Sequence, residues 1–365
     1  MCYRFETICV RGDSEYYPKD STGCINVPIY QSACFGRSKL GQSTGFDYSR
    51  AQNPTREYLE KAVAALESAR FGFAFSNGMA AITSFFLTLP KGSHVIVSED
   101  SYGGTIRLFE KLLCLHDLTV SFVDTSDIEN IRNAFTPETK IVYVETPGNP
   151  LMSVTDIKAV AELTHSKDAL LVVDNTFLTP YLQRPLDEGA DIAVQSGTKF
   201  LAGHNDTLAG FITTNNEEVA KQLSFISMTI GSGLSPFDSW LVVRGIKTLS
   251  VRLDRQCSNA ARLVEFLKAN PHVRKVLYPG KGSMISFYTD SEERAVKVLE
   301  SVRLIHFAES LGGVDSLITY PYTQTHADIP QEKRESKGIT KDLLRLSVGI
   351  EAVEDLREDL EKALA

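Results

Sequence analysis

Lys199 is the residue of this sequence whose surroundings point most directly to chemistry. It follows residues 191–195, which read as a short buried strand, and the turn formers Ser196, Gly197 and Thr198. In α/β folds, ligands bind just beyond the carboxyl ends of strands. Most lysines are solvated surface residues, but Lys199 lies among small, mostly uncharged residues with two hydroxyls close by. An amine placed in this way is a candidate nucleophile.

A carboxylate and hydroxyl groups accompany this lysine. Residues 170–174 read as a strand that ends in the carboxylate of Asp174. Ser196 and Thr198 supply the hydroxyls beside Lys199. Pyridoxal 5′-phosphate (PLP) needs an amine for its aldehyde, an anion for its ring nitrogen and donors for its phosphate. These groups together indicate a PLP site.

Three short segments carry a resemblance to a known family. They are Val-Val-Asp-Asn-Thr-Phe at 172–177, Ser-Gly-Thr-Lys at 196–199 and Gly-His-Asn-Asp at 203–206. In combination they resemble the Cys/Met-metabolism family of PLP-dependent enzymes, and the resemblance extends over nearly the whole chain. The family includes cystathionine γ-synthase, cystathionine γ- and β-lyases, methionine γ-lyase and O-acetylhomoserine sulfhydrylase. The resemblance implies an α/β protein of PLP-dependent transferase fold type I (aspartate aminotransferase-like).

The elements that must position these residues follow from hydrophobic periodicity. Short apolar strands alternate with helices near 126–134 and 155–165, which predicts a large, mostly parallel sheet covered by helices. An apolar periodic stretch over 236–267 predicts a connecting helix to a smaller C-terminal α/β domain. We expect an N-terminal arm over 1–46, a large PLP-binding domain over 47–246 and a small domain over 247–365. At 365 residues the chain is long enough for both domains.

The arm leads into a motif that concerns a second subunit. Residues 1–46 contain many glycine and proline breakers and read as an irregular arm over a neighbour. Tyr48 and Arg50 follow, just before a helix that Asn53 caps and Pro54 opens. On local sequence alone, a surface Tyr/Arg pair is an equally good interpretation. In the family this Tyr-x-Arg motif reaches the cofactor phosphate of the adjacent subunit, so the resemblance implies a homotetramer (a dimer of dimers) with shared active sites.

The resemblance assigns further residues to the cofactor. Gly78 and Met79 open a helix, where backbone N–H groups favour phosphate, although such a start is by itself more often a plain cap. In the family the equivalent amides hold the cofactor phosphate, and Asn77 stands here in place of the expected serine. By the same resemblance Tyr102 stacks on the pyridine ring and Asn149 hydrogen-bonds the phenolic oxygen.

Lys199 and Asp174 would carry the reaction. An opposite charge within about 4–6 Å shifts a pKa by roughly 1–3 units, so Asp174 would keep the ring nitrogen protonated. The ring could then accept the electrons left when Lys199 takes the substrate Cα proton, and Tyr102 could assist as acid or base. Arg345 lies in an apolar strand pattern, where a cation is costly without an anion. A structural salt bridge is one explanation, but the resemblance favours Arg345, with Ser310, as the site of the substrate α-carboxylate.

The choice of reaction rests on fewer residues. Family members that handle cystathionine carry acids at Asp47 and Glu309, where they meet the distal ammonium of cystathionine or cysteine; two surface acids are an equally good interpretation. Methionine γ-lyases carry a cysteine where this chain has Gly104. The sequence therefore favours a cystathionine γ-synthase-like enzyme, which replaces the γ-substituent of an activated homoserine with cysteine. Cystathionine γ- or β-lyase and O-acetylhomoserine sulfhydrylase stay open, and a non-catalytic family member is a remote alternative.

Composition narrows the remaining classes. The net charge of −8 argues against a nucleic-acid surface. No run approaches the roughly 20 apolar residues that span a bilayer, so we expect no membrane contact. None of the six cysteines has CxxC spacing to another, and none pairs with a nearby histidine in a way that suggests zinc, which predicts no metal site and reduced thiols in the cytoplasm. His326 belongs to another family motif and is expected to be structural.

Overall fold

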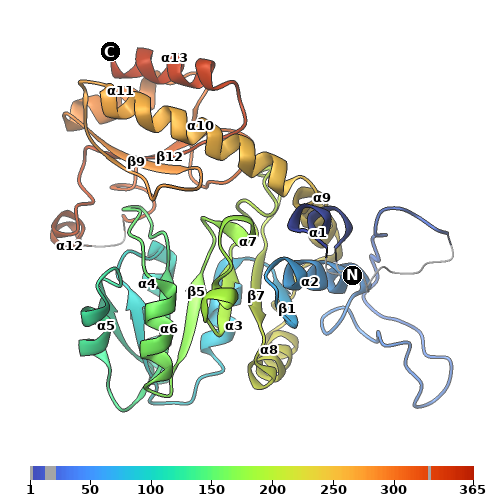
Figure 1. The fold of residues 1–365 in the computed structure, drawn as a ribbon. Helices are drawn as coiled ribbons and strands as arrows, with labels where there is room; N and C mark the ends of the chain where they lie inside the picture. Colours follow the sequence, from blue (N-terminus) through green and yellow to red (C-terminus); the bar gives the residue numbers. More distant parts are fainter. Residues whose placement is uncertain (1–2, 13–21, 328–329) are drawn as a thin grey trace.

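Two β-sheets organise the chain, whose computed structural model describes residues 3–12, 22–327 and 330–365 (Figure 1). Within these residues the larger sheet has seven strands in the order β1-β7-β6-β5-β4-β2-β3. The five strands from β6 to β3 are parallel, and β7 pairs antiparallel with both β1 and β6. The strands are β1 (Phe71–Phe75), β2 (His94–Ser98), β3 (Thr119–Val123), β4 (Thr139–Glu145), β5 (Leu170–Asp174), β6 (Ile192–Gln195) and β7 (Gly210–Thr214). The predicted mostly parallel sheet is confirmed.

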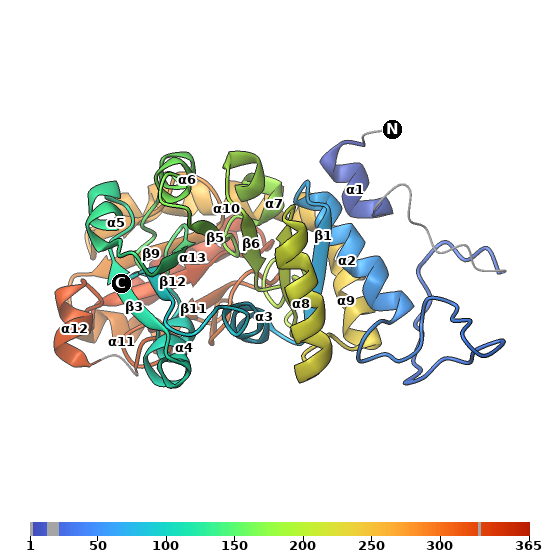
Figure 2. The same ribbon diagram turned by 90° about the horizontal axis from the view of Figure 1, so that it is seen from below.

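Helices cover both faces of this sheet, with α5, α6 and α7 on one side and α3 and α4 on the other (Figure 2). Successive strand residues point to opposite faces. Val97, Tyr143 and Val172 therefore pack with α3, α4 and α8, whereas Ile96 and Val142 pack with α5 and α6. The helices are α2 (Pro54–Leu66), α3 (Gly78–Phe86), α4 (Gly103–Lys111), η1 (Leu113–His116), α5 (Ile128–Ala134), α6 (Ile157–His165), α7 (Thr179–Leu182), η2 (Pro185–Glu188), α8 (Glu217–Ile230) and α9 (Pro236–Ile246). With both faces covered, ligands can reach the sheet at its strand ends.

The smaller sheet has the order β10-β11-β12-β9-β8 and lies above the larger one in Figure 1. One face, which includes Phe287, packs against α10, α11 and α13 in an apolar core. On the opposite face Arg345 of β12 lies between Thr319 and Ser286, and the Ser286 hydroxyl donates to the Pro150 carbonyl at 2.7 Å. The polar face of the small sheet therefore meets the large domain. Its elements are α10 (Leu249–Ala269), β8 (Val273–Leu277), β9 (Met284–Thr289), α11 (Glu292–Ser301), β10 (His306–Phe307), β11 (Leu317–Thr319), α12 (Gln331–Ser336), β12 (Leu343–Ser347) and α13 (Val353–Leu364).

The N-terminal arm contains a helix, α1 (Phe5–Arg11), so the expectation of an irregular arm was wrong there. Cys9 is buried, and the Tyr58 hydroxyl of α2 donates to the Arg11 carbonyl at 3.2 Å. The helix forms because its apolar side chains pack on the body of the protein. Seven residues show too little periodicity to reveal this from sequence. Residues 22–46 have no helix and project beside α2 (Figure 1).

The apolar stretch over 236–267 forms two helices, so the prediction of a connecting helix across it was wrong. The backbone leaves the helical range at Thr248, where ψ is 11°. Arg252, in the first turn of α10, donates to the carbonyls of Gly245 at 2.9 Å and Phe200 at 2.8 Å. The break therefore lets one buried guanidinium bind the end of α9 and the segment after the predicted site lysine. Both helices are apolar-periodic, so their pattern hides the break.

The remaining sequence predictions concern the cysteines, membrane-spanning helices and the limits of the domains. The five cysteines in the described part are free, and Cys2 lies outside it. None of the helices in the described ranges is long and apolar enough to cross a membrane. The limits of the three predicted units, 1–46, 47–246 and 247–365, stay predictions.

Candidate active site

A cavity of about 260 Å³ lies where the strand ends of the large sheet meet the small domain. Eleven of the fourteen predicted site residues line it, although they come from distant parts of the sequence. They are Gly78, Met79, Tyr102, Asn149, Asp174, Ser196, Thr198, Lys199, Glu309, Ser310 and Arg345. The structure therefore places an amine, a guanidinium, carboxylates and hydroxyls around one space.

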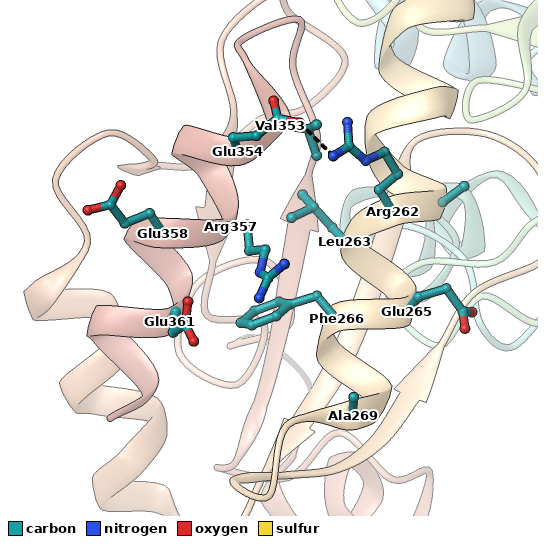
Figure 3. A pocket seen from close by; sticks show the side chains of 11 residues that line it. Arg262, Leu263, Glu265, Phe266, Ala269, Val353, Glu354, Arg357, Glu358 and Glu361 are labelled. Carbon is teal, nitrogen blue, oxygen red and sulfur yellow. Dashed lines mark hydrogen bonds and ion pairs between the residues drawn. The ribbon is translucent and has the colours of Figure 1, made fainter.

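A wider groove on the small domain has different chemistry (Figure 3). It lies between α10 and α13, where Arg262 pairs with Glu354 at 2.5 Å and the Arg357 guanidinium lies 5.5 Å from the centre of the Phe266 ring. Arg262 and Glu354 neutralise each other, and no lysine lines the groove. The groove therefore offers no amine for an aldehyde.

Lys199 stands in the turn that follows β6. Its Nζ donates to the Ser310 hydroxyl at 2.9 Å, which links the two domains at the reactive amine. Burial and the positive charge of Arg345 together lower the pKa of Lys199 to about 8, although the negative charge of Glu309 opposes the shift. Roughly a tenth of the amine is therefore neutral at pH 7, far more than for an exposed lysine. A neutral amine can act as a nucleophile or base.

Asp174 is the buried carboxylate at the end of β5. One oxygen accepts from the Thr176 hydroxyl at 2.6 Å and the Thr176 amide at 3.0 Å, and the other accepts from the Tyr143 hydroxyl at 3.0 Å. Burial raises the pKa of Asp174, and no lysine or arginine of the described residues pairs with it. Neighbouring Glu145, opposite Asp174 in the parallel register, has its pKa raised well above the usual range by burial and by that carboxylate. This pair of carboxylates favours an incoming cationic group.

The start of α3 forms another part of the cavity. Asn77, which stands in place of the expected serine, caps the helix by accepting from the Ala80 amide at 2.8 Å. Gly78 and Met79 follow, and the first N–H groups of a helix have no partner within it. The Ser196 side chain lies beside Gly78, since a β-carbon on that glycine would lie 3.2 Å from the Ser196 β-carbon. Amides and a hydroxyl converge here in the way an anion requires.

Arg345 is 2% exposed, with no ion pair among the described residues. Its guanidinium donates to the Asn149 side-chain oxygen at 2.9 Å, the Ser310 carbonyl at 3.1 Å and the Thr319 hydroxyl at 3.2 Å. Its Nε has no hydrogen-bond partner in that part of the chain. A salt bridge therefore does not explain this buried arginine, and it keeps the capacity to bind an anion.

Tyr102 precedes α4 at the opening of the cavity. Its backbone amide donates to Glu145 Oε2 at 2.8 Å, and the residue is 42% exposed. Glu145 thus fixes the backbone from which the ring extends.

Tyr48, Arg50 and Asp47 lie outside the cavity of their own chain, and all three are exposed. Asp47 pairs with Arg37 at 2.9 Å, and the hydrogen bond from Arg37 lowers the pKa of Asp47. Arg50 donates to the Met228 carbonyl at 2.6 Å, and its guanidinium lies 5.4 Å from the centre of the Tyr48 ring. The structure leaves these residues at the surface.

Sequence reasoning missed several contributors. Thr176 follows Asp174 by two residues, and this spacing of carboxylate and hydroxyl is a local signal that could have identified it. Tyr143 gave no such signal, because it contacts Asp174 only after distant segments pack together. His326 was expected to be structural, but its contact with Asn149 also joins distant segments and was not predicted. The same holds for Thr325, which lines the cavity from the small domain.

The family described as Cys/Met metabolism PLP-dependent enzyme matches residues 6–365. This chain belongs to that family. It is 50% identical over 343 residues to the cystathionine gamma-synthase/O-acetylhomoserine (thiol)-lyase of Bacillus subtilis (strain 168), covering 94% of this chain and 92% of that protein. It is 46% identical over 360 residues to the cystathionine beta-lyase of Lactococcus lactis subsp. cremoris, covering 94% and 95%. The crystal structure of cystathionine gamma-lyase from Lactobacillus plantarum complexed with L-serine has a TM-score of 0.96 and 40% identity, covering 99% of this chain and 98% of that chain.

As a member of the Cys/Met metabolism family, the protein is a PLP-dependent enzyme of sulfur amino-acid metabolism with fold type I, as predicted. The cavity fits the cofactor: Lys199 offers an amine, Asp174 a buried anion without a cation, and the start of α3 a place for phosphate. When bound, PLP supplies an aldehyde carbon and an electron-accepting ring.

Proposed function

We propose that this enzyme is cystathionine γ-synthase-like and replaces the γ-substituent of an activated homoserine with cysteine. The observation that carries the proposal is the acid Glu309 at the opening of the cavity, beside Ser310. Its negative charge opposes the pKa shifts of both Lys199 and Arg345, so all three groups face one space. An amino-acid substrate has a carboxylate for Arg345, and a cystathionine or cysteine portion has a second ammonium for Glu309.

The chain's own groups divide the work. Arg345 binds the substrate α-carboxylate, and the Lys199 amine takes the proton from the substrate Cα. Asp174 holds a cationic ring nitrogen, and the amides of Gly78 and Met79 with Ser196 and Thr198 bind the phosphate. Tyr102 covers the ring and assists proton transfer. Asn149 donates to the phenolic oxygen.

Asn149 is oriented for that role by its partner. A guanidinium can only donate, so the Asn149 side-chain oxygen must face Arg345. Its amide NH₂ is then left to face elsewhere in the cavity that Asn149 lines. The Asn149 side chain therefore links Arg345, which binds the substrate carboxylate, to the place of the cofactor's phenolic oxygen.

The alternatives are cystathionine γ- or β-lyase and O-acetylhomoserine sulfhydrylase activities, which need the same amine and carboxylate site. Gly104 argues against a methionine-degrading enzyme, because methionine γ-lyases carry a cysteine at this position. A β-carbon there would lie 2.5 Å from the Tyr102 ring, so a cysteine requires a different ring position.

A product assay decides between these reactions. The purified enzyme is given O-acetyl- or O-succinylhomoserine with cysteine, the same esters with sulfide, or cystathionine alone. The proposal expects cystathionine from ester and cysteine as the fastest reaction. Faster pyruvate release from cystathionine identifies a β-lyase, faster 2-oxobutyrate release a γ-lyase, and faster homocysteine formation from sulfide a sulfhydrylase; each contradicts the proposal.

Glu309→Ala tests the distal ammonium site. We expect KM for cysteine or cystathionine to rise about tenfold, equivalent to about 1.4 kcal/mol, because an ion pair at a partly closed opening is lost. Bound-cofactor absorbance should not change. Glu300→Ala, which removes an exposed acid on α11, is the matched control and should leave KM unchanged. Unchanged KM for both amino acids with impaired use of sulfide would contradict this role of Glu309.

We also propose that the active unit is a homotetramer, a dimer of dimers in which each subunit completes its neighbour's site. Support comes from exposed Tyr48 and Arg50, and from exposed apolar side chains nearby at the end of α8 and the start of α9. These are Phe225, Met228, Ile230 and Phe237. Such side chains are typical of an interface with another subunit, and Asp47 would reach the neighbouring cavity with Tyr48 and Arg50.

Mixed subunits test the shared site. Arg50→Ala and Lys199→Ala subunits, each inactive alone, should regain activity when mixed, because one site of a mixed pair has both residues intact. A statistical mixture can recover roughly a quarter of wild-type activity, since half of the pairs are mixed and each has one complete site of two. Each variant mixed with itself is the control. No recovery after subunit exchange, shown by mass spectrometry, would mean that each site belongs to a single chain.

We further propose a cytoplasmic enzyme that acts on small amino acids and binds neither nucleic acid nor membranes. The acidic net charge and the lack of a predicted metal site or CxxC pair support this assignment.

A further inference from the structure

His326 is buried at the contact between the two domains, although it does not line the cavity. Its Nε2 lies 3.0 Å from the Asn149 carbonyl oxygen, and its Nδ1 lies 2.8 Å from the Thr325 hydroxyl. A carbonyl oxygen can only accept, so Nε2 carries the hydrogen. Nδ1 then accepts from the Thr325 hydroxyl, and both ring nitrogens of a neutral imidazole are satisfied.

Asn149 is held from three directions. Its amide donates to the Asp100 carbonyl at 2.9 Å, its side-chain oxygen accepts from Arg345 at 2.9 Å, and its carbonyl accepts from His326. The first contact comes from the large domain, and the other two come from the small domain. His326 is therefore the only one of these groups that fixes the Asn149 backbone from across the domain contact within the described residues.

The segment that carries His326 is pressed against the large domain elsewhere. A β-carbon on Gly103 would lie 2.5 Å from the Thr325 carbonyl oxygen, so the segment sits directly on the start of α4. Further along, Lys337 Nζ donates to the Glu99 carbonyl at 3.0 Å. The His326 backbone amide donates to the Pro321 carbonyl at 3.1 Å and closes the turn. The imidazole is thus held by its own segment as well as by the Thr325 hydroxyl and the Asn149 main-chain carbonyl.

We propose that His326 is a positioning residue: its neutral Nε2–H form holds Asn149 against the cofactor and ties that residue to the small domain that supplies Arg345. This inference rests on the proposed role of Asn149 in the PLP site. Burial lowers the pKa of His326 to about 4, and the charge of Arg345 adds to the shift, so the imidazole stays neutral at working pH. The imidazole of His326 therefore does not act as an acid in the reaction.

Two variants, His326→Gln and His326→Asn, test whether a hydrogen-bond donor at this position must reach the Asn149 carbonyl. Glutamine places an amide nitrogen close to the position of Nε2, whereas asparagine places it close to Nδ1 and too far from Asn149. We expect His326→Asn to raise both the PLP dissociation constant, measured by titration of the apoenzyme, and the KM for amino acids about tenfold. His326→Gln should stay within about threefold of wild type in both quantities.

Several results would overturn the proposal. One is a His326→Asn protein with a lower Tm but wild-type PLP affinity and KM, which would make His326 a purely structural residue. Another is a His326→Gln protein that loses the acid or base limb of its pH–rate profile, which would make the imidazole a catalytic residue. Failure of the wild type to bind PLP would instead contradict the proposed function.

A measurement on the unmodified enzyme covers the case in which the asparagine variant does not fold. Nitrogen-15 NMR of the histidine side chains should show one ring that keeps the Nε2–H form from pH 6 to 9, and this signal should be missing in His326→Gln. If the signal that is lost in His326→Gln titrates in this range, or comes from a ring with its hydrogen on Nδ1, the proposal is overturned.

Discussion

Lys199→Ala is expected to lose the visible absorbance of the bound cofactor and to lower kcat about a thousandfold or more. The amine is both the group that reacts with the PLP aldehyde and the base at the substrate Cα, and positioned proton transfer alone contributes roughly 10²–10⁴-fold. Its pKa of about 8 already favours the base form more than that of an exposed lysine. Absorbance spectra and steady-state rates measure both effects.

Lys199→Arg separates charge from amine chemistry. It keeps a positive charge near Ser310 but has no free amine, so it should fail in the same way as Lys199→Ala. Borohydride treatment of the wild type should attach the cofactor to the peptide that contains Lys199, as seen by mass spectrometry. Lys268→Ala, at an exposed position on α10, should behave as wild type. Normal turnover by Lys199→Ala would contradict the assignment of Lys199 as the catalytic amine.

Arg345→Leu is expected to raise KM for the amino-acid substrate about a hundredfold, equivalent to about 2.7 kcal/mol. A hydrogen bond to a charged group contributes roughly 1.5–3 kcal/mol, and the substrate carboxylate would lose its buried partner. Leucine would face Thr319 and Ser286 on the polar face of the small sheet, so Tm is measured alongside KM to show that the variant stays folded. Initial rates over a range of substrate concentration measure the effect.

Arg345→Lys is the graded control for this site. It keeps the charge but loses the planar fork that bonds Asn149, Ser310 and Thr319 at once, so KM should rise about tenfold. The two variants should therefore fall in the order Arg, Lys, Leu. If both lower Tm and leave KM unchanged, Arg345 serves only to join the two sheets.

Local sequence patterns predicted much of the site. The strand that ends in Asp174 and the turn before Lys199 were predictable, because side-chain type and spacing along a few residues determine a βα unit and its strand end. The alternation of strands and helices likewise predicted a mostly parallel, covered sheet, which the structure confirms. The sequence pattern did not reveal α1 or the break near Thr248. In both places, packing decided between local conformations of similar energy.

The sequence by itself determined the chemistry of this protein: one lysine, one aspartate and the motifs around them indicate the cofactor. Only the tertiary structure decided how the small domain completes the site. Asn149 and Arg345 are 196 residues apart, and His326 reaches Asn149 across 177 residues. No spacing rule covers such distances, because these contacts exist only when the polar face of one sheet packs on the strand ends of another.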